Sequence, residues 1–577
     1  MSNEKYLSEK YKILLILFIS LGIYYPSIFA QVNSLDDLRM IQDMLNIKEI
    51  NIKNILFPES TIYYYRPLLN LTFIFDRLVW NCHESFMHME NIILHSINGI
   101  MVYYISSDLI NKFRIKTSGM VPLFISLLFI LHPINTEPVN WISGRTDVLA
   151  GTFVFVSFLI FLKKGITNVL WNIFASFVYF LGLLSKESAL GLLPVIFYLM
   201  ILKEVYIENI PLKNKIIAIT PFFVITVIYF IFRLFPNNDT GIGMITNPKE
   251  YLDVFAIAGS SIKAFGFYIK KLLIPLPLNF GIIEINRGLY FLLGILSIFL
   301  TLYMAIRRKN AITFFFIFCI PFIIIAIPVA IYKMAWTPLA ERYLYISSFG
   351  ISAFIVLVIN SIPFSLGKIN FVLIAAILLL SGVVTGKRNI IWQSNLTLYE
   401  DTVKKSPNFA VARNEYGVAL YNKGEHNKAY IEFQKAAELS KGSGFKLSKM
   451  NEILLAQKGN ESLIASYSSM LGSVEEKQSK DIIKKIISFT EASIAQEKEM
   501  KKKNALYREL LSNYTKLHKI ENNGFYLYKI GQIYIALGDK TKAVEYFQKS
   551  FIESPNEYFS EPARKLAKDL KNEINNK

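Results

Sequence analysis

The sequence predicts an all-α protein made of a polytopic membrane helix bundle followed by a C-terminal α-solenoid. The chain has 577 residues, of which 53% are hydrophobic and only 18% are charged, and this composition excludes an intrinsically disordered protein. Apolar residues dominate from residue 11 to about residue 386, whereas the remainder is rich in Lys, Glu, Asn and Ser and repeats a helical pattern. We therefore predict a membrane domain at 1–388 and a soluble domain at 389–577.

Apolar stretches of the length needed to cross a bilayer, roughly 17–20 residues, occur about eleven times in the membrane domain. They lie at 11–30, 88–108, 120–136, 147–163, 169–184, 187–203, 216–235, 290–307, 311–331, 343–363 and 369–386. We expect the first stretch to be an uncleaved anchor, because Ile28 breaks the small-residue pattern of a signal-peptide cleavage site.

Basic residues beside these stretches predict their orientation. Lysines and arginines gather before the first stretch and after the second, fourth, sixth and eighth, so those ends are expected in the cytoplasm, whereas Lys387 and Arg388 are an exception. The N-terminus is then cytoplasmic, and the loops at 31–87 and 236–289 and the C-terminal domain are extracytoplasmic, in a bacterial plasma membrane or in the endoplasmic reticulum of a eukaryote. This pattern accounts for the net charge of +18 without a nucleic-acid partner.

The C-terminal domain carries a repeat at each end. Segments 410–443 and 524–557 have the spacing of a tetratricopeptide repeat (TPR), with small residues where paired helices approach closely and a phenylalanine between them. These positions are Gly417, Ala429 and Phe433 in the first repeat and Gly531, Ala543 and Phe547 in the second. We expect degenerate repeats between them and a protein or peptide partner on the concave face of the array.

The first long loop opens with SLDDLRMIQDML at 34–45, whose apolar residues recur at helical spacing. This pattern predicts an amphipathic helix lying on the membrane surface. Two interpretations of Asp36 and Asp37 stay open. In the first interpretation the acids are structural, because Ser34 suits the N-cap of such a helix and negative charges suit its first turn. In the second interpretation one of the acids is a general base.

The second apolar stretch contains a polar stripe formed by His88, Asn91, His95 and Asn98, which share one helix face. Polar groups inside a span cost free energy unless they face protein or a water-filled cavity. We predict no metal site, because no histidine pair has the i, i+4 spacing typical of helical ligands. The sequence indicates no cofactor and leaves a divalent cation open. With two cysteines, Cys82 and Cys319, it also excludes a disulfide framework.

Charged residues gather at the predicted extracytoplasmic ends of the spans. The set comprises Arg66, His132, Glu137, Arg145, Asp147, Lys186, Glu187, Glu341 and Arg342. Each residue taken singly fits an interfacial ion pair. Together they place carboxylates beside Arg66, Arg145, Lys186 and Arg342, which is an arrangement suited to a lipid phosphate with a carboxylate base.

The segments YRPLLNLTF, HPINTEPVNWISGRTD and LLSKESAL, with the pattern His88-x-x-Asn91-x-x-x-His95, resemble the transmembrane and tetratricopeptide-repeat-containing (TMTC) proteins. The resemblance implies a GT-C glycosyltransferase fold and transfer of a sugar, usually mannose, from a polyprenyl- or dolichyl-phosphate carrier to a hydroxyl on protein. Asp36 and Asp37 match the family's acidic pair. Asn135 and Pro138 depart from it, because relatives often carry His and Ala there.

We therefore expect a membrane glycosyltransferase with Asp36 as the general base and inversion at the anomeric carbon. The charged set and the polar stripe would bind the phosphate and sugar of the donor. A lipid phosphate leaves readily once its charge is stabilised, so no general acid is needed. Two other functions stay open, which are a lipid-linked sugar flippase or transporter and a membrane-anchored TPR scaffold without catalysis.

Overall fold

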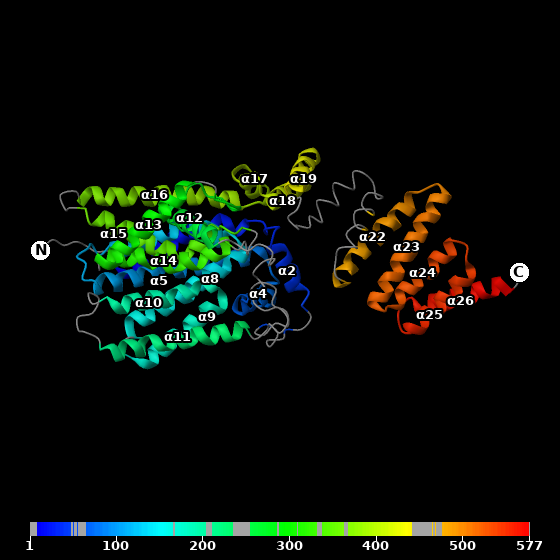
Figure 1. The fold of residues 1–577 in the computed structure, drawn as a ribbon, viewed down its shortest axis with the longest axis horizontal. Coiled ribbons are helices and arrows are strands. Elements are labelled where there is room, and N and C mark those ends of the chain that lie inside the picture. Colours follow the sequence, from blue (N-terminus) through cyan, green and yellow to red (C-terminus); the bar gives the residue numbers. More distant parts are fainter. Residues whose placement is uncertain are drawn as a thin grey trace. The chain divides into compact units, whose positions relative to one another are not determined.

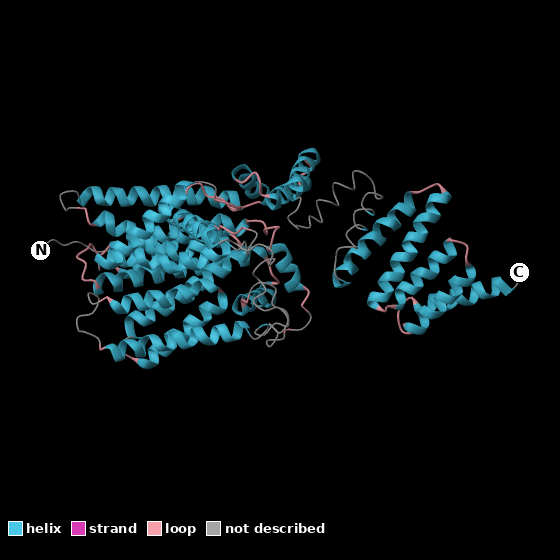
Figure 2. Cartoon of the chain, viewed as in Figure 1, coloured by secondary structure: helices cyan, strands magenta, loops and turns pink. Residues whose placement is uncertain are grey.

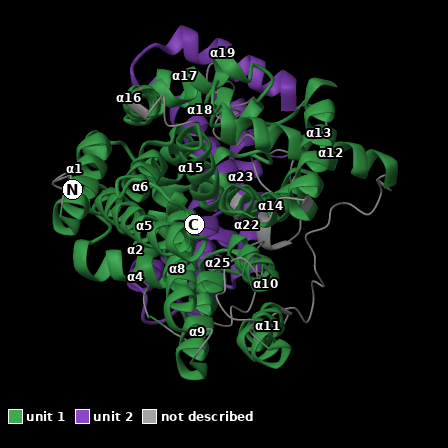
Figure 3. Cartoon of the chain, turned by 90° about the vertical axis from the view of Figure 1, so that its left-hand side faces the viewer, with its two compact units in different colours: residues 1–420 green, residues 421–577 purple. Residues whose placement is uncertain are grey.

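The computed structural model of the chain is shown in Figure 1. It describes residues 8–47, 65–165, 168–202, 211–234, 254–285, 288–307, 310–331, 337–362, 367–440 and 476–575, with the single positions 50, 55, 464 and 468. Regular structure in these residues is entirely helical (Figure 2). The chain divides into two compact units, residues 1–420 and 421–577 (Figure 3). The division lies near the end of the first helix of the repeat at 410–443, whereas the sequence pattern placed it at residue 388.

The first unit is a bundle of long helices that run side by side. These helices are α1 (Glu9–Tyr24), α5 (Glu84–Lys112), α6 (Val121–Leu131), α8 (Arg145–Ile160), α9 (Val169–Ser185), α10 (Leu192–Ile201), α11 (Leu212–Leu234), α12 (Val254–Leu273), α13 (Gly288–Arg307), α14 (Ala311–Ile331), α15 (Tyr345–Asn360) and α16 (Gly367–Trp392). Shorter elements join them. They are η1 (Tyr25–Phe29), α2 (Asp37–Leu45), α4 (Pro67–Trp80), η2 (Pro133–Asn135), α7 (Thr136–Asn140), η3 (Ile142–Gly144), η4 (Phe161–Gly165), η5 (Glu187–Gly191) and η7 (Glu341–Leu344).

Among the described residues, seven helices are long and apolar enough to cross a membrane, or eight if the bent pair Val121–Leu131 and Pro133–Asn140 is one span. An integral, multi-pass membrane protein is therefore confirmed, whereas the count of eleven spans is not. All eleven predicted stretches contain helix, but α9 and the η5–α10 segment are shorter than a typical span. Helix α5 has 29 residues and carries the polar stripe, which lowers its mean hydropathy.

Helix α12 lies inside segment 236–289, which the sequence analysis assigned to a loop, and that assignment is wrong for residues 254–273. Its second half is buried against the bundle. At its crossing with α13, a Cβ on Gly266 would lie 2.1 Å from the carbonyl oxygen of Tyr290, and a Cβ on Gly294 would lie 2.1 Å from that of Ile262. Only glycine permits this approach. The three lysines of α12 interrupt its apolar run, so it does not stand out as a span.

The remaining helices are those of the C-terminal repeats. They are α17 (Asn395–Lys405) and α18 (Ala410–Asn422), and then α19 (His426–Ser440), α22 (Glu476–Gln496), α23 (Met500–Glu521), α24 (Gly524–Ala536), α25 (Lys540–Glu553) and α26 (Ser560–Asn575). The pair α24–α25 has the predicted TPR packing, because a Cβ on Gly531 would lie 2.7 Å from the Phe547 ring. Gly538 turns between these helices with a positive φ of 85°. Most of the region expected to hold degenerate repeats before α22 lies outside the described residues.

Candidate active site

The acidic pair lies at the start of α2, so the predicted helix is confirmed there, and its place on the membrane surface stays a prediction. The N-cap is Asp36 and not Ser34, so the expected capping by Ser34 is wrong. The side chain of Asp36 makes no capping hydrogen bond. The carboxylate of Asp37 accepts hydrogen bonds from the backbone N–H of Ser143, at 2.9 Å, and from its hydroxyl. Ser34 donates its hydroxyl to Glu415 instead of capping the helix.

The two aspartates differ in their exposure and in their charges. Asp37 is only 1% exposed, and burial raises its pKa to about 7. Asp36 is half-buried, and burial raises its pKa while the charges of Arg342 and Arg39 oppose the increase. Since Asp36 is accessible and has no hydrogen bond to a helix N–H, it is the member of the pair that can meet a substrate.

A pH dependence of stability follows from the burial of Asp37. In the unfolded chain this carboxyl has a pKa near 3.9, so the folded protein holds the proton more tightly. The stability contributed by the bound proton is complete below about pH 4 and is lost as the pH rises through about 7. We expect the melting temperature in detergent to fall between pH 5 and pH 8, and to fall less in Asp37→Asn. If the melting temperature fell equally with pH in the wild-type protein and in Asp37→Asn, the raised pKa of Asp37 would be contradicted.

Arg342 and Lys186 both lie against the aromatic ring of Tyr343. The guanidinium of Arg342 donates to the carboxylate of Glu137 and to the hydroxyl of Thr337, and it stacks 4.8 Å from the ring centres of Trp141 and Tyr343. The ammonium of Lys186 lies 2.6 and 2.7 Å from the carboxylate oxygens of Asp147 and 5.0 Å from the ring centre of Tyr343. Two cations therefore face one tyrosine ring.

Glu187 extends this group toward α11. Its carboxylate lies 3.5 Å from Arg66 and 3.0 Å from Arg233. The three side chains are 19–27% exposed, so solvent reaches this end of the group. Sequence reasoning missed Arg233, although one signal was present. It is an arginine at the predicted extracytoplasmic end of a span, where the positive-inside pattern does not require a basic residue.

Arg145 lies in a different, fully buried network. Its guanidinium donates to Asp76 at 2.6 Å, to Asn91 at 3.0 Å and to the carbonyl oxygen of Met87 at 3.1 Å, and it lies 3.0 Å from Glu90. Arg145 is 1% exposed and Asp76 is 0% exposed. With its donors directed at these groups, Arg145 holds α4, α5 and α8 together and presents no open face to a lipid phosphate.

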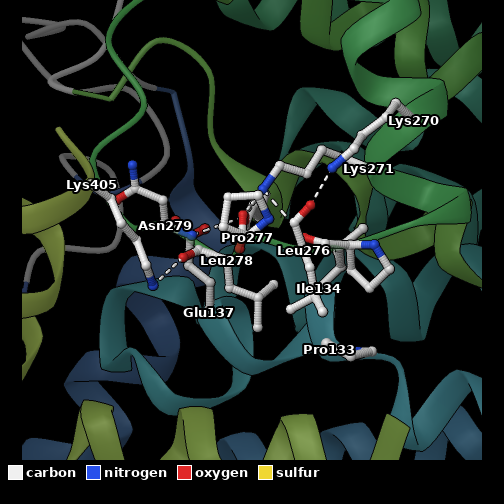
Figure 4. A network of polar contacts seen from close by, with 12 residues as sticks. Pro133, Ile134, Glu137, Lys270, Lys271, Leu276, Pro277, Leu278, Asn279 and Lys405 are labelled. Carbon is white, nitrogen blue, oxygen red and sulfur yellow. Dashed lines mark hydrogen bonds and ion pairs between the residues drawn. The ribbon is translucent and has the colours of Figure 1, made fainter. Parts of the chain in front are cut away.

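Glu341 also lies in a network of its own, and the lysines of that network are shown in Figure 4. Its carboxylate pairs with Lys271 and accepts the backbone N–H of Asn279 at 3.0 Å. Lys270, Lys271 and Lys405 direct their ammonium groups at the carbonyl oxygens of Leu276, Pro277 and Leu278, respectively. A cavity of about 300 Å³ lies beside these lysines. The lysines hold the turn at 275–279, and the sequence analysis identified none of them.

The polar stripe serves the core of the bundle. His95 and Asn98 each lie 2.8 Å from the hydroxyl of Tyr345, and Asn91 donates to the carbonyl oxygen of Trp141 at 2.9 Å. His88 is buried on the same helix, and His132 contacts the carbonyl oxygen of Leu272 at 3.1 Å. Within the described residues, no group of three or more His, Cys, Asp or Glu side chains is arranged to hold a metal ion.

Parts of the chain are similar to known proteins. Residues 526–554 match the tetratricopeptide repeat family. Over 65% of its length, the chain is 23% identical to the mouse protein O-mannosyl-transferase TMTC3, covering 44% of that protein, and 23% identical to the protein O-mannosyl-transferase F38B6.6 of Caenorhabditis elegans, covering 54% of it. The chain is thus similar in sequence to the TMTC proteins over about two thirds of its length. It spans about half the length of the relatives that it matches most extensively.

Two further matches of the chain are more limited. The Xenopus laevis protein O-mannosyl-transferase tmtc2 is 31% identical over 138 residues, which are 23% of this chain and 16% of that protein. An oligosaccharyltransferase of Archaeoglobus fulgidus aligns in structure with a TM-score of 0.35 and 10% identity, over 67% of this chain and 56% of that one.

Proposed function

We propose that this chain is a membrane glycosyltransferase that transfers a sugar from a polyprenyl-phosphate-linked donor to a hydroxyl acceptor on the extracytoplasmic face. Mannose is the first sugar to test, because the relatives are named O-mannosyl-transferases. The observation that carries the proposal is that accessible Asp36 lies within electrostatic reach of Arg342, which belongs to a group of cations and aromatic rings.

The proposed reaction is a single inverting displacement. The acceptor hydroxyl gives its proton to Asp36 while its oxygen forms a bond to the anomeric carbon. The bond from that carbon to the phosphate oxygen breaks, and the electron pair leaves with the lipid phosphate. Positive charge near the phosphate stabilises this leaving group. Burial raises the pKa of Asp36, which strengthens it as a base.

The cations proposed for the phosphate are Arg66, Lys186, Arg233 and Arg342. Each already has a carboxylate partner, so a bound phosphate would share or replace Glu137, Asp147 or Glu187. Arg145, Glu341, His95 and His132 are assigned a supporting role, because their polar atoms already have partners in the interior of the bundle. A serine or threonine of a protein, or a glycan hydroxyl, is the proposed acceptor, with the TPR unit as its binding module.

The direct test uses the full-length protein in liposomes, with polyprenyl-phosphate-linked radiolabelled mannose and a membrane protein extract as the acceptor. We expect labelled protein and released polyprenyl phosphate with the wild-type protein. Donor movement between leaflets without transfer would support a flippase instead. No transfer with mannose, glucose or N-acetylglucosamine donors would support a scaffold.

Topology gives a second test, because a lipid-carried donor requires an extracytoplasmic site. Ser118 and Asn556 are exposed, whereas the native Cys82 and Cys319 are buried, so that we expect little signal from them if they are left in place. In intact cells, an impermeant thiol reagent should label Asn556→Cys and should not label Ser118→Cys until the membrane is opened. Labelling of Ser118→Cys alone would reverse the proposed orientation.

A further inference from the structure

Helices α17 and α18 belong to the same compact unit as the acidic pair, although the sequence pattern assigned them to the soluble domain. They and the residues before them make a series of hydrogen bonds to residues 31–34. Gln31 N–H donates to the carbonyl oxygen of Gln393 at 2.9 Å. Asn395 donates to the carbonyl oxygen of Val32 at 2.8 Å and accepts the N–H of Ser34 at 3.1 Å. The segment before Asp36 is thus hydrogen-bonded to the residues around α17 at Gln31, Val32 and Ser34.

Two side chains of these helices reach closest to the acidic pair. The hydroxyl of Tyr399, which is fully buried, donates to the side-chain oxygen of Asn33 at 2.9 Å. The same oxygen accepts the N–H of Leu35, which shapes the turn into α2. Glu415, on α18, accepts the hydroxyl of Ser34 at 2.5 Å.

We propose that Tyr399 and Glu415 are positioning residues that set the direction and the local charge of Asp36. The inference rests on the proposed function, in which Asp36 is the general base. Because Asp36 makes no capping hydrogen bond, its carboxylate is directed by the backbone of residues 33–35. Tyr399 and Glu415 bind the side chains of Asn33 and Ser34 from outside the loop, so the first repeat helices complete the catalytic site in addition to any binding of partners.

Glu415 has a second effect, which Tyr399 does not share. The charged groups that face Asp36 are Arg342 and Arg39, which favour its ionised form, and Glu415 and Asp37, which disfavour it. Loss of the negative charge at Glu415 should make Asp36 a weaker base. Substitutions at the two residues are therefore expected to differ. A change at Glu415 should slow the reaction and shift its pH profile, whereas a change at Tyr399 should slow the reaction without shifting the profile.

The test compares Glu415→Gln and Tyr399→Phe in the full-length protein, with the lipid-linked sugar donor that supports wild-type transfer. We expect kcat to fall roughly 10-fold in each, because a displacement of about 1 Å at a reacting group can cost up to about 100-fold. The KM for the donor should stay within about 2-fold. The acid limb of the pH–rate profile should move to lower pH only in Glu415→Gln. Glu400→Gln is the matched control, since Glu400 lies on α17 and pairs with Lys404 at the surface.

Ser34→Ala probes the same contact from the loop side and keeps the inference testable if a helix variant folds poorly. Its effect should add little to that of Glu415→Gln, because both act on one hydrogen bond, which Ser34→Ala removes and Glu415→Gln weakens by taking the charge from its acceptor. Wild-type kcat and pH profile in Glu415→Gln, Tyr399→Phe and Ser34→Ala would overturn the positioning role while leaving the transferase proposal intact. Absence of transfer by the wild-type protein would overturn the transferase proposal itself.

Discussion

Replacing Asp36 with asparagine is expected to lower the rate of sugar transfer by roughly 10²–10⁴ and to leave the protein folded. The large loss is expected because an amide cannot take the proton of the acceptor hydroxyl. The small effect on folding is expected because Asp36 is half-buried and makes no capping hydrogen bond, so that only a charge–dipole interaction of about 0.3–1 kcal/mol is lost. Transfer rate and melting temperature, measured on the same purified samples, check both parts.

Asp43→Asn is the matched control for this prediction. Asp43 lies on the same helix and pairs with Arg39 at the surface, so the control removes one charge from α2 without touching the acidic pair. Asp37→Asn should reduce the rate less than Asp36→Asn, because Asp37 is buried against Ser143. A full-rate Asp36→Asn with an inactive Asp37→Asn would exchange the two roles. If both variants were fully active, Glu137 and Asp147 would be the next candidates for the base.

Replacing Arg145 with methionine is expected to remove most of the folded protein from the membrane. The change leaves Asp76, which is 0% exposed, without its ion-pair partner. Breaking a buried ion pair from one side costs about 3–5 kcal/mol, which is a large part of the stability of a typical domain. Asn91 and the carbonyl oxygen of Met87 also lose their donor. Yield after detergent extraction and melting temperature measure the loss.

Two further variants separate this structural role from a role in donor binding. The double change Arg145→Met with Asp76→Asn removes both charges, so it should recover part of the lost stability. Arg233→Met removes a cation that is 27% exposed, so it should fold normally and weaken donor binding. An Arg145→Met protein that folds normally but no longer binds donor would restore Arg145 to the phosphate site.

The sequence alone determined the helical membrane bundle, the surface helix after Ser34 and the TPR pair at 524–557. Each depends on local physics. Long apolar runs form helices in a bilayer because backbone groups must bond within the segment. The surface helix follows from the periodicity of its apolar residues, and the repeat follows from a small residue at Gly531 opposite Phe547. Interactions of this kind depend on residues that are near each other in the chain, so a pattern reveals them.

Only the tertiary structure decided which charges remain available for chemistry. Arg145 and Arg342 look equivalent in the sequence, yet Arg145 is enclosed by Asp76 and Glu90 while Arg342 faces the acidic pair. The partners of Asp37 and Glu415 were also revealed only by the tertiary structure. Asp37 is buried against Ser143, and Glu415 accepts a hydrogen bond from Ser34 although it lies on a predicted repeat helix. The physical reason is that an ion pair or hydrogen bond is set by distance in space. These partners are separated by tens to hundreds of residues, and no local pattern encodes which of them will meet.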